Sequence, residues 1–168
     1  QTCALPIYKL HNPDGPALIR YEDDRILTEE WYINGKLHND NGPALILNDS
    51  SECKTFAYWY KDGIRHNETG PAVVIYKGIE SLRHGLEQVG QEETENIIEQ
   101  RWYKNGLLSR TDGPAVIKYY TSSNNDCHLE DALNRTEGNN AMLGDQRTRK
   151  EQWYFNGKLH RTDGPAYI

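Results

Sequence analysis

Apolar and polar residues recur along this chain in one fixed order. A Trp-Tyr pair is followed by Asn-Gly or Asp-Gly, then by Gly-Pro-Ala and a short apolar run. The pattern is complete in residues 31–44, 59–72, 102–115 and 153–166, the second to fifth units, and only its second half is present in residues 10–17, the first unit. Repetition of this kind is typical of arrays in which neighbouring units bury each other's apolar faces.

Each complete unit carries a dipeptide that favours a tight β-hairpin. These turn residues are Asn34 and Gly35, Asp62 and Gly63, Asn105 and Gly106, and Asn156 and Gly157. They accept the positive φ angles of a type I′ turn, which suits two antiparallel strands. A two-residue turn fixes the pairing in the second unit as Ile33 with Lys36, Tyr32 with Leu37 and Trp31 with His38.

A second corner follows each hairpin. Its glycine and proline are Gly42 and Pro43, Gly70 and Pro71, Gly113 and Pro114, and Gly164 and Pro165. We expect the short polar residue before the glycine to bond the local backbone, the glycine to adopt an unusual φ, and the proline to end the pairing. The apolar runs that follow predict strands with both faces at least partly covered, so each unit should contain about three short strands.

The predicted fold is all-β, a repeat array of antiparallel β-hairpins with polar or helical insertions between units. We expect one β-repeat domain over residues 8–168, with units at about 8–21, 28–47, 56–76, 99–119 and 150–168 and inserts at 77–98 and 120–149. Residues 48–57 are predicted to be a polar loop. In residues 77–101, helical spacing followed by glutamates up to Glu99 predicts a short helix and an acidic return, and residues 129–133 predict a helical turn.

The first residues and the cysteines add little to the fold. Residues 1–7 resemble the translation of a common sequencing adapter, so we expect a non-native segment in front of a chain whose true N-terminus is missing. Cys3, Cys53 and Cys127 lie outside the repeated positions and have no regular spacing. They are expected to be free thiols in a reducing, cytoplasmic compartment.

The composition narrows the classes of function. A net charge of −6 argues against nucleic-acid binding, which needs clustered Lys and Arg, and disfavours adsorption to anionic membranes. The sequence contains no nucleophile elbow, zinc-protease motif, phosphate-binding glycine loop or Cys-x-x-Cys pair. We therefore expect a protein that is not an enzyme and that needs no cofactor and no metal.

Two repeated residue types are candidates for binding. The tryptophans Trp31, Trp59, Trp102 and Trp153 would form either an exposed aromatic ladder or, as we favour, the main apolar mass of the fold. The histidines include His38, His66 and His160, and Ser109 takes their place in the fourth unit. We favour half-buried histidines that face tryptophan and bond the corner backbone over metal ligands or acid-base pairs, which require converging partners.

The repeated unit resembles MORN-type repeats, most closely a divergent variant that reads roughly Trp-Tyr-x-Asn-Gly-x-x-His-Arg-x-Asp-Gly-Pro-Ala. Residues 153–166 match it throughout, whereas Asn39 and Asn67 replace Arg and Ser109 replaces His. The resemblance implies an extended β-hairpin array of a kind typical of bacterial, phage and large-virus genomes. Some relatives are proposed antitoxins, and the wider family is associated with protein scaffolding and with lipids.

Three hypotheses about function follow. The leading one is a non-enzymatic scaffold that binds a protein partner across one face or through the acidic inserts. The second is a membrane-surface module, which the net charge disfavours, and an enzyme with a site built by the inserts is the least favoured. Because the chain opens on half a unit, we also expect self-association through uncapped strand edges.

Overall fold

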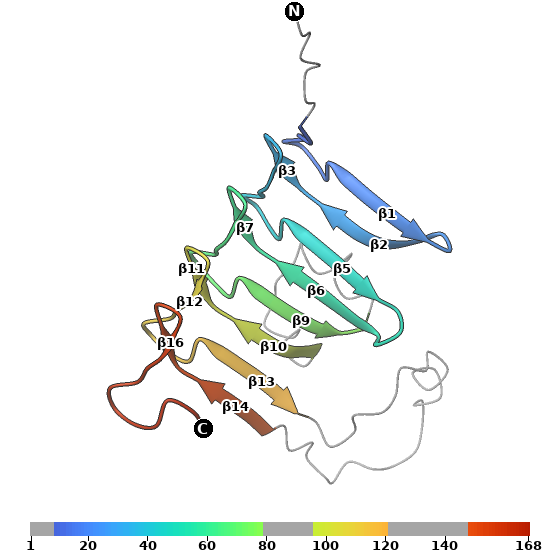
Figure 1. Ribbon diagram of the computed structural model, residues 1–168. Coiled ribbons are helices and arrows are strands. Elements are labelled where there is room, and N and C mark those ends of the chain that lie inside the picture. The colour runs from blue at the N-terminus through green and yellow to red at the C-terminus, as the bar shows by residue number, and fades with distance from the viewer. Residues whose placement is uncertain (1–8, 79–95, 121–147) are drawn as a thin grey trace, which may run out of the picture.

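The computed structural model describes residues 9–78, 96–120 and 148–168 (Figure 1). Within these residues the fold is all-β and contains no α-helix, which confirms the predicted hairpin array. Eight longer strands form one antiparallel sheet in the order β1-β2-β5-β6-β9-β10-β13-β14. Their bounds are β1 Leu18–Glu22, β2 Arg25–Glu30, β5 Leu45–Asp49, β6 Lys54–Tyr58, β9 Val73–Lys77, β10 Ile97–Arg101, β13 Val116–Tyr120 and β14 Thr148–Gln152.

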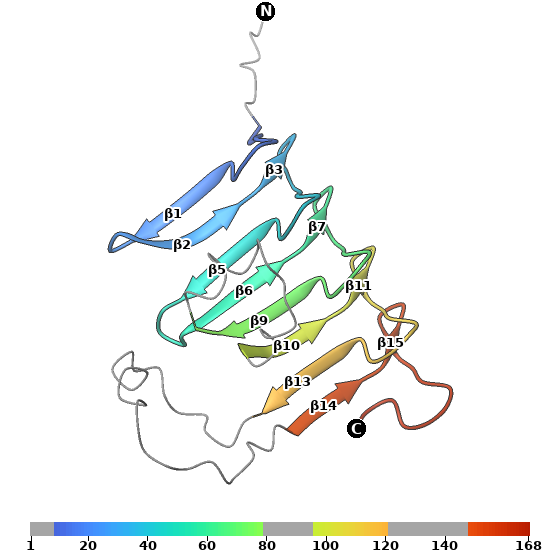
Figure 2. The same ribbon diagram turned by 180° about the vertical axis from the view of Figure 1, so that it is seen from behind.

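Four short hairpins form separate two-stranded sheets beside the large one. They are β3 Tyr32–Ile33 with β4 Lys36–Leu37, β7 Tyr60–Lys61 with β8 Ile64–Arg65, β11 Tyr103–Lys104 with β12 Leu107–Leu108, and β15 Tyr154–Phe155 with β16 Lys158–Leu159. Both views show them side by side along one end of the long strands (Figures 1 and 2). We call this arrangement the hairpin row.

A repeat therefore contains four strands, and the prediction of three was wrong. The expected single strand through the tryptophan is divided at that residue. In the second unit the N–H of Trp31 donates to the carbonyl of Ala44 at 2.8 Å, while its own carbonyl accepts the N–H of His38 at 3.0 Å. The N–H of Trp31 thus bonds within the large sheet and its carbonyl within the short hairpin, because the chain passes from one sheet to the other at this residue.

The turn chemistry predicted from the sequence is confirmed. Both central residues of each short hairpin have positive φ, for example 53° at Asn34 and 77° at Gly35. The register pairs Tyr32 with Leu37 and Ile33 with Lys36. The other three hairpins repeat this register, so the dipeptide determines the pairing throughout the row.

The two described turns between long strands lie at one end of the sheet. The turns that join β1 to β2 and β5 to β6 lie opposite the hairpin row, at the end of the sheet where β9 and β13 also end (Figure 1). The predicted helix and helical turn fall in residues 79–95 and 121–147, outside the described residues.

Two of the predicted irregular stretches are strands instead. Only residues 50–53 separate β5 from β6, so most of the predicted polar loop at residues 48–57 belongs to the ladder. Glu99, expected in an acidic return, is a buried residue of β10. It pairs with Arg101 and lies 3.4 Å from Lys118 Nζ on β13. One cation of the same strand and one of the neighbouring strand therefore allow a carboxylate to be placed in the sheet.

The core is thin and consists of small and branched residues. Ala44, Ala72 and Ala115, from the Gly-Pro-Ala motifs, are fully buried. Neighbouring residues of the same strand are buried together in β9 and β13, which confirms strands covered on both faces. All four tryptophans are half-buried, so the fully buried core does not contain them. No helix in the described part of the chain has the length and apolar character needed to cross a membrane.

The two outer strands of the large sheet differ. Among the described strands, β1 pairs only with β2, and its Ile19 and Tyr21 side chains are exposed. On the other side, β14 is followed in space by residues 166–168. Glu151 and Ile168 exchange two backbone hydrogen bonds, of 2.8 and 3.0 Å, so this edge is partly covered.

Candidate binding site on the hairpin row

The hairpin row presents lysines and large apolar side chains on one face. In each hairpin, the pair next to the turn combines one lysine with one apolar residue. These pairs are Ile33 with Lys36, Lys61 with Ile64, Lys104 with Leu107, and Phe155 with Lys158. Ile64, Leu107 and Phe155 are 51%, 50% and 47% exposed. Because side chains alternate along a strand, this face is also the one that carries the tryptophans and histidines.

Turn glycines allow the hairpins to stack closely. A Cβ added at Gly106 would lie 3.4 Å from Ile64 Cγ2, and one at Gly157 would lie 3.5 Å from Leu107 Cδ2. Ile64 and Leu107 therefore pack against the turn of the following unit, whereas at Gly63 the neighbouring side chain is Lys36. The row is a continuous ridge of alternating charge and apolar surface.

The repeat histidines connect one unit to the next. Nδ1 accepts the first turn N–H of the following hairpin, from Asn34 to His11 at 3.1 Å, from Asp62 to His38 at 3.1 Å and from Asn105 to His66 at 3.2 Å. This geometry places the imidazole proton on Nε2. In His38, Nε2 lies 3.2 Å from Asp40 Oδ1. The Nδ1 lone pair is thus used in a hydrogen bond between units. The histidine bonds to the turn of the next unit and not, as predicted, to the backbone of its own corner.

The glycine N–H of each turn forms a second bond between units. Gly35, Gly63, Gly106 and Gly157 donate to the carbonyls of Leu10, Leu37, Arg65 and Leu108, at 2.8 to 2.9 Å. In each case the acceptor immediately precedes the histidine, or Ser109 in the fourth unit. The type I′ turn therefore directs both of its N–H groups to the preceding unit.

Corners are built in two ways, depending on the residue after the histidine. In the second unit Asn39 Oδ1 accepts the N–H of Asn41 at 3.0 Å, and its Nδ2 donates to the carbonyl of Pro43 at 3.0 Å. Asn12 and Asn67 make the same bonds. The turn-forming side chain therefore lies three residues before the glycine, and the prediction that placed it directly before Gly-Pro was wrong.

In the fourth and fifth units an arginine replaces this asparagine. The Arg110 guanidinium lies 4.1 Å from the centre of the Trp102 ring, and Arg161 lies 4.0 Å from that of Trp153. Each also donates Nε–H to an aspartate, at 2.8 Å for Asp112. The bond from Arg110 holds the pKa of Asp112 below its usual value.

The corner glycines do not adopt the positive φ that was expected. Their role in the arginine units is close approach, because a Cβ at Gly113 would lie 3.2 Å from Arg110 Cζ. In the asparagine units the space is ordinary, with 3.5 Å between a Cβ at Gly42 and Asn39 Nδ2. In the arginine units the glycine therefore leaves room for the guanidinium, and in neither kind of unit does it supply a positive φ.

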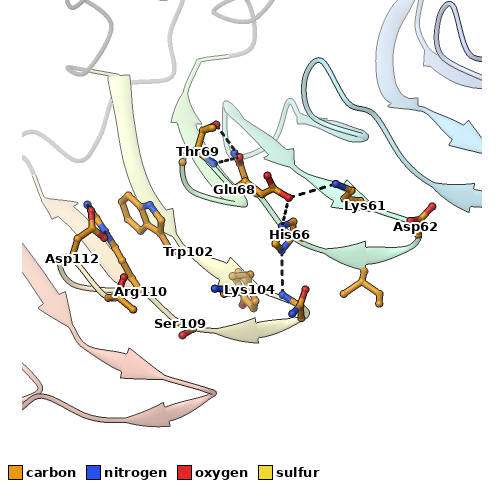
Figure 3. Close-up of a pocket in the computed structure, with 16 residues that line it drawn as sticks. Lys61, Asp62, His66, Glu68, Thr69, Trp102, Lys104, Ser109, Arg110 and Asp112 are labelled. Carbon is orange, nitrogen blue, oxygen red and sulfur yellow. Dashed lines mark hydrogen bonds and ion pairs between the residues drawn. The ribbon is translucent and has the colours of Figure 1, made fainter.

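A groove of about 730 Å³ lies between the third and fourth units (Figure 3). The corner that contains His66 and Glu68 forms one wall. The opposite wall contains Trp102, Lys104 and Ser109. The groove opens on the face of the hairpin row that carries the lysines and tryptophans.

Two local features distinguish the units around this groove. The residue after His11, His38 and Ser109 donates its N–H to the tyrosine carbonyl of the next hairpin, at 2.9, 3.4 and 3.2 Å. The corresponding bond from Asn67 to Tyr103 is not formed within the described residues. In addition, the groove wall carries a serine where other units carry an imidazole, and Ser109 Oγ accepts the N–H of Asn156 at 3.4 Å.

The groove is lined by equal numbers of cationic and anionic side chains, which are Lys61, Lys104 and Arg110 and Asp62, Glu68 and Asp112. Lys61 Nζ lies 3.5 Å from Glu68 Oε1, and Arg110 is bonded to Asp112. Lys104 makes no ion pair with any residue in the described part of the chain. Its ammonium group is therefore available to a ligand on this wall.

On the opposite face of the hairpins, Arg65 joins the same two units. Its guanidinium lies 5.1 Å from the ring of Tyr58 and 5.2 Å from that of Tyr103, and Nη2 donates to Tyr60 Oη at 2.9 Å. Burial raises the pKa of Tyr58. These contacts hold the third and fourth units together on the face opposite the groove.

The structure brings some of the predicted site residues together and leaves others apart. His66 and Trp102 line one groove, whereas Trp31 and Trp59 belong to other junctions. Trp153 is covered by Arg161, and His160 is exposed beside Phe155, 6.1 Å away between ring centres. Sequence reasoning did not identify Lys61, Lys104 or Arg110. Ser109, where the histidine pattern breaks, lines the same groove but bonds to Asn156 of the fifth unit.

Comparison of the chain with protein-family models, with curated proteins and with solved structures found no match.

Proposed function

We propose that this chain is a non-enzymatic β-repeat scaffold that binds a protein partner along its hairpin row. The observation that carries the proposal is the ridge formed by Ile64 and Leu107, each about half exposed, with lysines beside them. Large apolar side chains in a polar surround are characteristic of protein interfaces. Lysine supplies electrostatic complementarity to an acidic partner.

The histidine geometry supports a role other than catalysis. Nδ1 of His38 accepts the Asp62 N–H, and this leaves the proton on Nε2 beside Asp40. A histidine in this state offers neither a free lone pair to a metal nor a free base to a substrate. The repeated arrangement is explained by stacking alone.

A peptide-display library panned against the intact chain tests the proposal. Ile64→Ser with Leu107→Ser should abolish binding of the enriched peptides while the fold, followed by circular dichroism, is retained. Tyr21→Ser with Tyr120→Ser is the matched control, because both tyrosines are exposed away from the hairpin row. Equal binding to the Ile64/Leu107 variant, or no enrichment at all, would contradict the proposal.

Membrane-surface binding is a second candidate, because exposed lysines recur along the row. These are Lys9, Lys36, Lys61, Lys104 and Lys158. The neighbouring corners carry a series of exposed acids, Asp14, Asp40, Glu68, Asp112 and Asp163. Such a mixed surface favours a protein over a uniformly anionic bilayer. Failure to co-sediment with phosphatidylserine vesicles at low salt would remove this candidate.

A further inference from the structure

The chain contains four Asn-Gly pairs, which begin at Asn34, Asn41, Asn105 and Asn156. This dipeptide is chemically labile, because the peptide nitrogen of glycine is unhindered and can reach the carbonyl carbon of the asparagine side chain. Three of the pairs form type I′ turns of the hairpin row, and the pair at Asn41 lies in the corner of the second unit. All four asparagines are exposed, so exposure does not distinguish them.

The turn pairs are held by hydrogen bonds on both sides of the asparagine side chain. In the fourth unit the N–H of Asn105 donates to His66 Nδ1 at 3.2 Å, and that of Gly106 donates to the carbonyl of Arg65 at 2.9 Å. Asn34 and Asn156 are held in the same way. The nitrogen that would react is therefore already bonded, and the turn has to break these bonds before the reaction.

The corner pair lacks this restraint. The N–H of Asn41 donates to Asn39 Oδ1 at 3.0 Å. Within the described residues, however, the N–H of Gly42 and the side chain of Asn41 form no hydrogen bond. The turn conformation is also absent, since neither Asn41 nor Gly42 has a positive φ. The reacting nitrogen and the side chain that it would attack are thus both free in the folded corner.

We infer that Asn41 is a site of spontaneous covalent modification in the folded protein. The Gly42 nitrogen forms a bond to Cγ of Asn41, the Cγ–Nδ2 bond breaks, and ammonia leaves with the proton that the peptide nitrogen gives up. Water then opens the resulting succinimide ring at either of its two carbonyls, which yields aspartate or isoaspartate. The reaction consumes only water, and the inference is independent of the proposed scaffold function.

The two products should differ in their effect on the corner. In the first unit an aspartate already occupies the equivalent position, and the N–H of Asp14 donates to Asn12 Oδ1 at 3.2 Å. The aspartate product should therefore keep the corner intact. Isoaspartate adds a methylene group to the main chain between the Asn41 N–H and the Pro43 carbonyl. Because both groups bond to the side chain of Asn39, the longer segment should lose one of the two bonds.

Incubation of the intact chain at mildly alkaline pH, followed by peptide mapping with mass spectrometry, measures the reaction at all four asparagines. Asn41 should react at least about tenfold faster than each turn asparagine, a factor that corresponds to about 1.4 kcal/mol for breaking the turn bonds. In urea the four rates should become comparable, because the dipeptide is the same.

Gly42→Ala is the matched variant, because a methyl group hinders the attacking nitrogen. An added Cβ would lie 3.5 Å from Asn39 Nδ2, and the residue has no positive φ, so the variant should fold. Its reaction at Asn41 should be severalfold slower than that of wild type. Asn41→Asp should unfold at the wild-type midpoint, whereas the isoaspartyl fraction, separated by chromatography, should unfold at a lower temperature.

Equal rates at the four asparagines of the folded chain, or a slower rate at Asn41 than at any turn, would overturn the inference. A reaction at Asn41 that occurs in urea but not in the folded chain would overturn it as well. An isoaspartyl fraction as stable as wild type would contradict the effect assigned to the corner.

Discussion

Each repeat histidine acts as an acceptor for the unit that follows, and this role sets both its tautomer and its tolerance to substitution. In the second unit His38 receives the Asp62 N–H, and in the fourth unit the smaller Ser109 receives the Asn156 N–H over a longer distance. The shared requirement is a hydrogen-bond acceptor at this position. Ring size and charge are secondary.

His38→Ala should destabilise the chain by about 1 to 2 kcal/mol, because it removes one hydrogen bond and the packing of a half-buried ring. His38→Ser should cost less, since the hydroxyl provides an acceptor as it does at Ser109. Urea unfolding followed by tryptophan fluorescence measures both. Equal losses for the two variants would show that packing, and not the acceptor, is responsible.

The arginine corners should add an acid-sensitive contribution to stability. The bonds from Arg110 and Arg161 lower the folded-state pKa values of Asp112 and Asp163. A depressed carboxyl pKa stabilises the fold above the unfolded-state value, near 4, and this contribution is lost as the pH falls through the folded-state pKa. Both carboxyls are exposed, so the effect should be small.

Asp112→Asn with Asp163→Asn should therefore flatten the dependence of the unfolding midpoint on pH below about 4. Asp14→Asn is the control, because this corner has Asn12 in place of an arginine. A pH profile unaltered by the double substitution would contradict a contribution from the arginine corners.

At the scale of the element, the two kinds of glycine should respond differently to a methyl group. Gly63, at φ 81°, has 3.6 Å between an added Cβ and Lys36, while Gly70, without a positive φ, has 3.5 Å to Asn67. The available space is similar, so backbone conformation is the main difference. Gly63→Ala should cost about 1 kcal/mol and Gly70→Ala close to nothing. Thermal unfolding of the two variants measures the contrast, and equal losses would contradict it.

The sequence was sufficient to predict the short hairpins, because Asn-Gly and Asp-Gly impose both the turn type and the pairing of Tyr32 with Leu37. It did not reveal that β6 begins at Lys54, since the preceding residues are polar and the strand is stabilised by its neighbours β5 and β9. Nor did it identify the partner of His38. That partner, Asp62, belongs to the next unit, and inspection of one unit does not show how far the following one is displaced.

At the scale of the molecule, nearly all the ladder contacts join neighbours, as expected for a one-dimensional array. The groove could not be predicted from the repeat, because it occurs at one of the described junctions and not at the others that share the same pattern. Ser109 was visible in the sequence, but the missing bond between Asn67 and Tyr103 depends on how the third and fourth units stack. A pattern common to all units predicts the scaffold, and the exceptions mark the candidate site.

The outer strand β1 leads us to propose self-association. It pairs only with β2 in the described sheet and exposes Ile19 and Tyr21, which makes it a template for another strand. Light scattering should detect oligomers that grow with concentration. Ile19→Lys with Tyr21→Lys should suppress them, whereas Tyr120→Lys on the inner strand β13 should not. A monodisperse monomer at high concentration would refute the proposal.

The bonds from the turn glycines also bear on how the protein ages chemically. Deamidation of an Asn-Gly pair begins when the glycine nitrogen attacks the asparagine side chain, and Asn34, Asn105 and Asn156 all precede glycine. In each case that nitrogen donates its hydrogen to a carbonyl of the preceding unit, at 2.8 to 2.9 Å. This hydrogen bond between units keeps the glycine nitrogen from attacking the side chain. Deamidation of these asparagines should therefore require local opening of the turn. Asp62 shows that the turn already accommodates a carboxylate at this position.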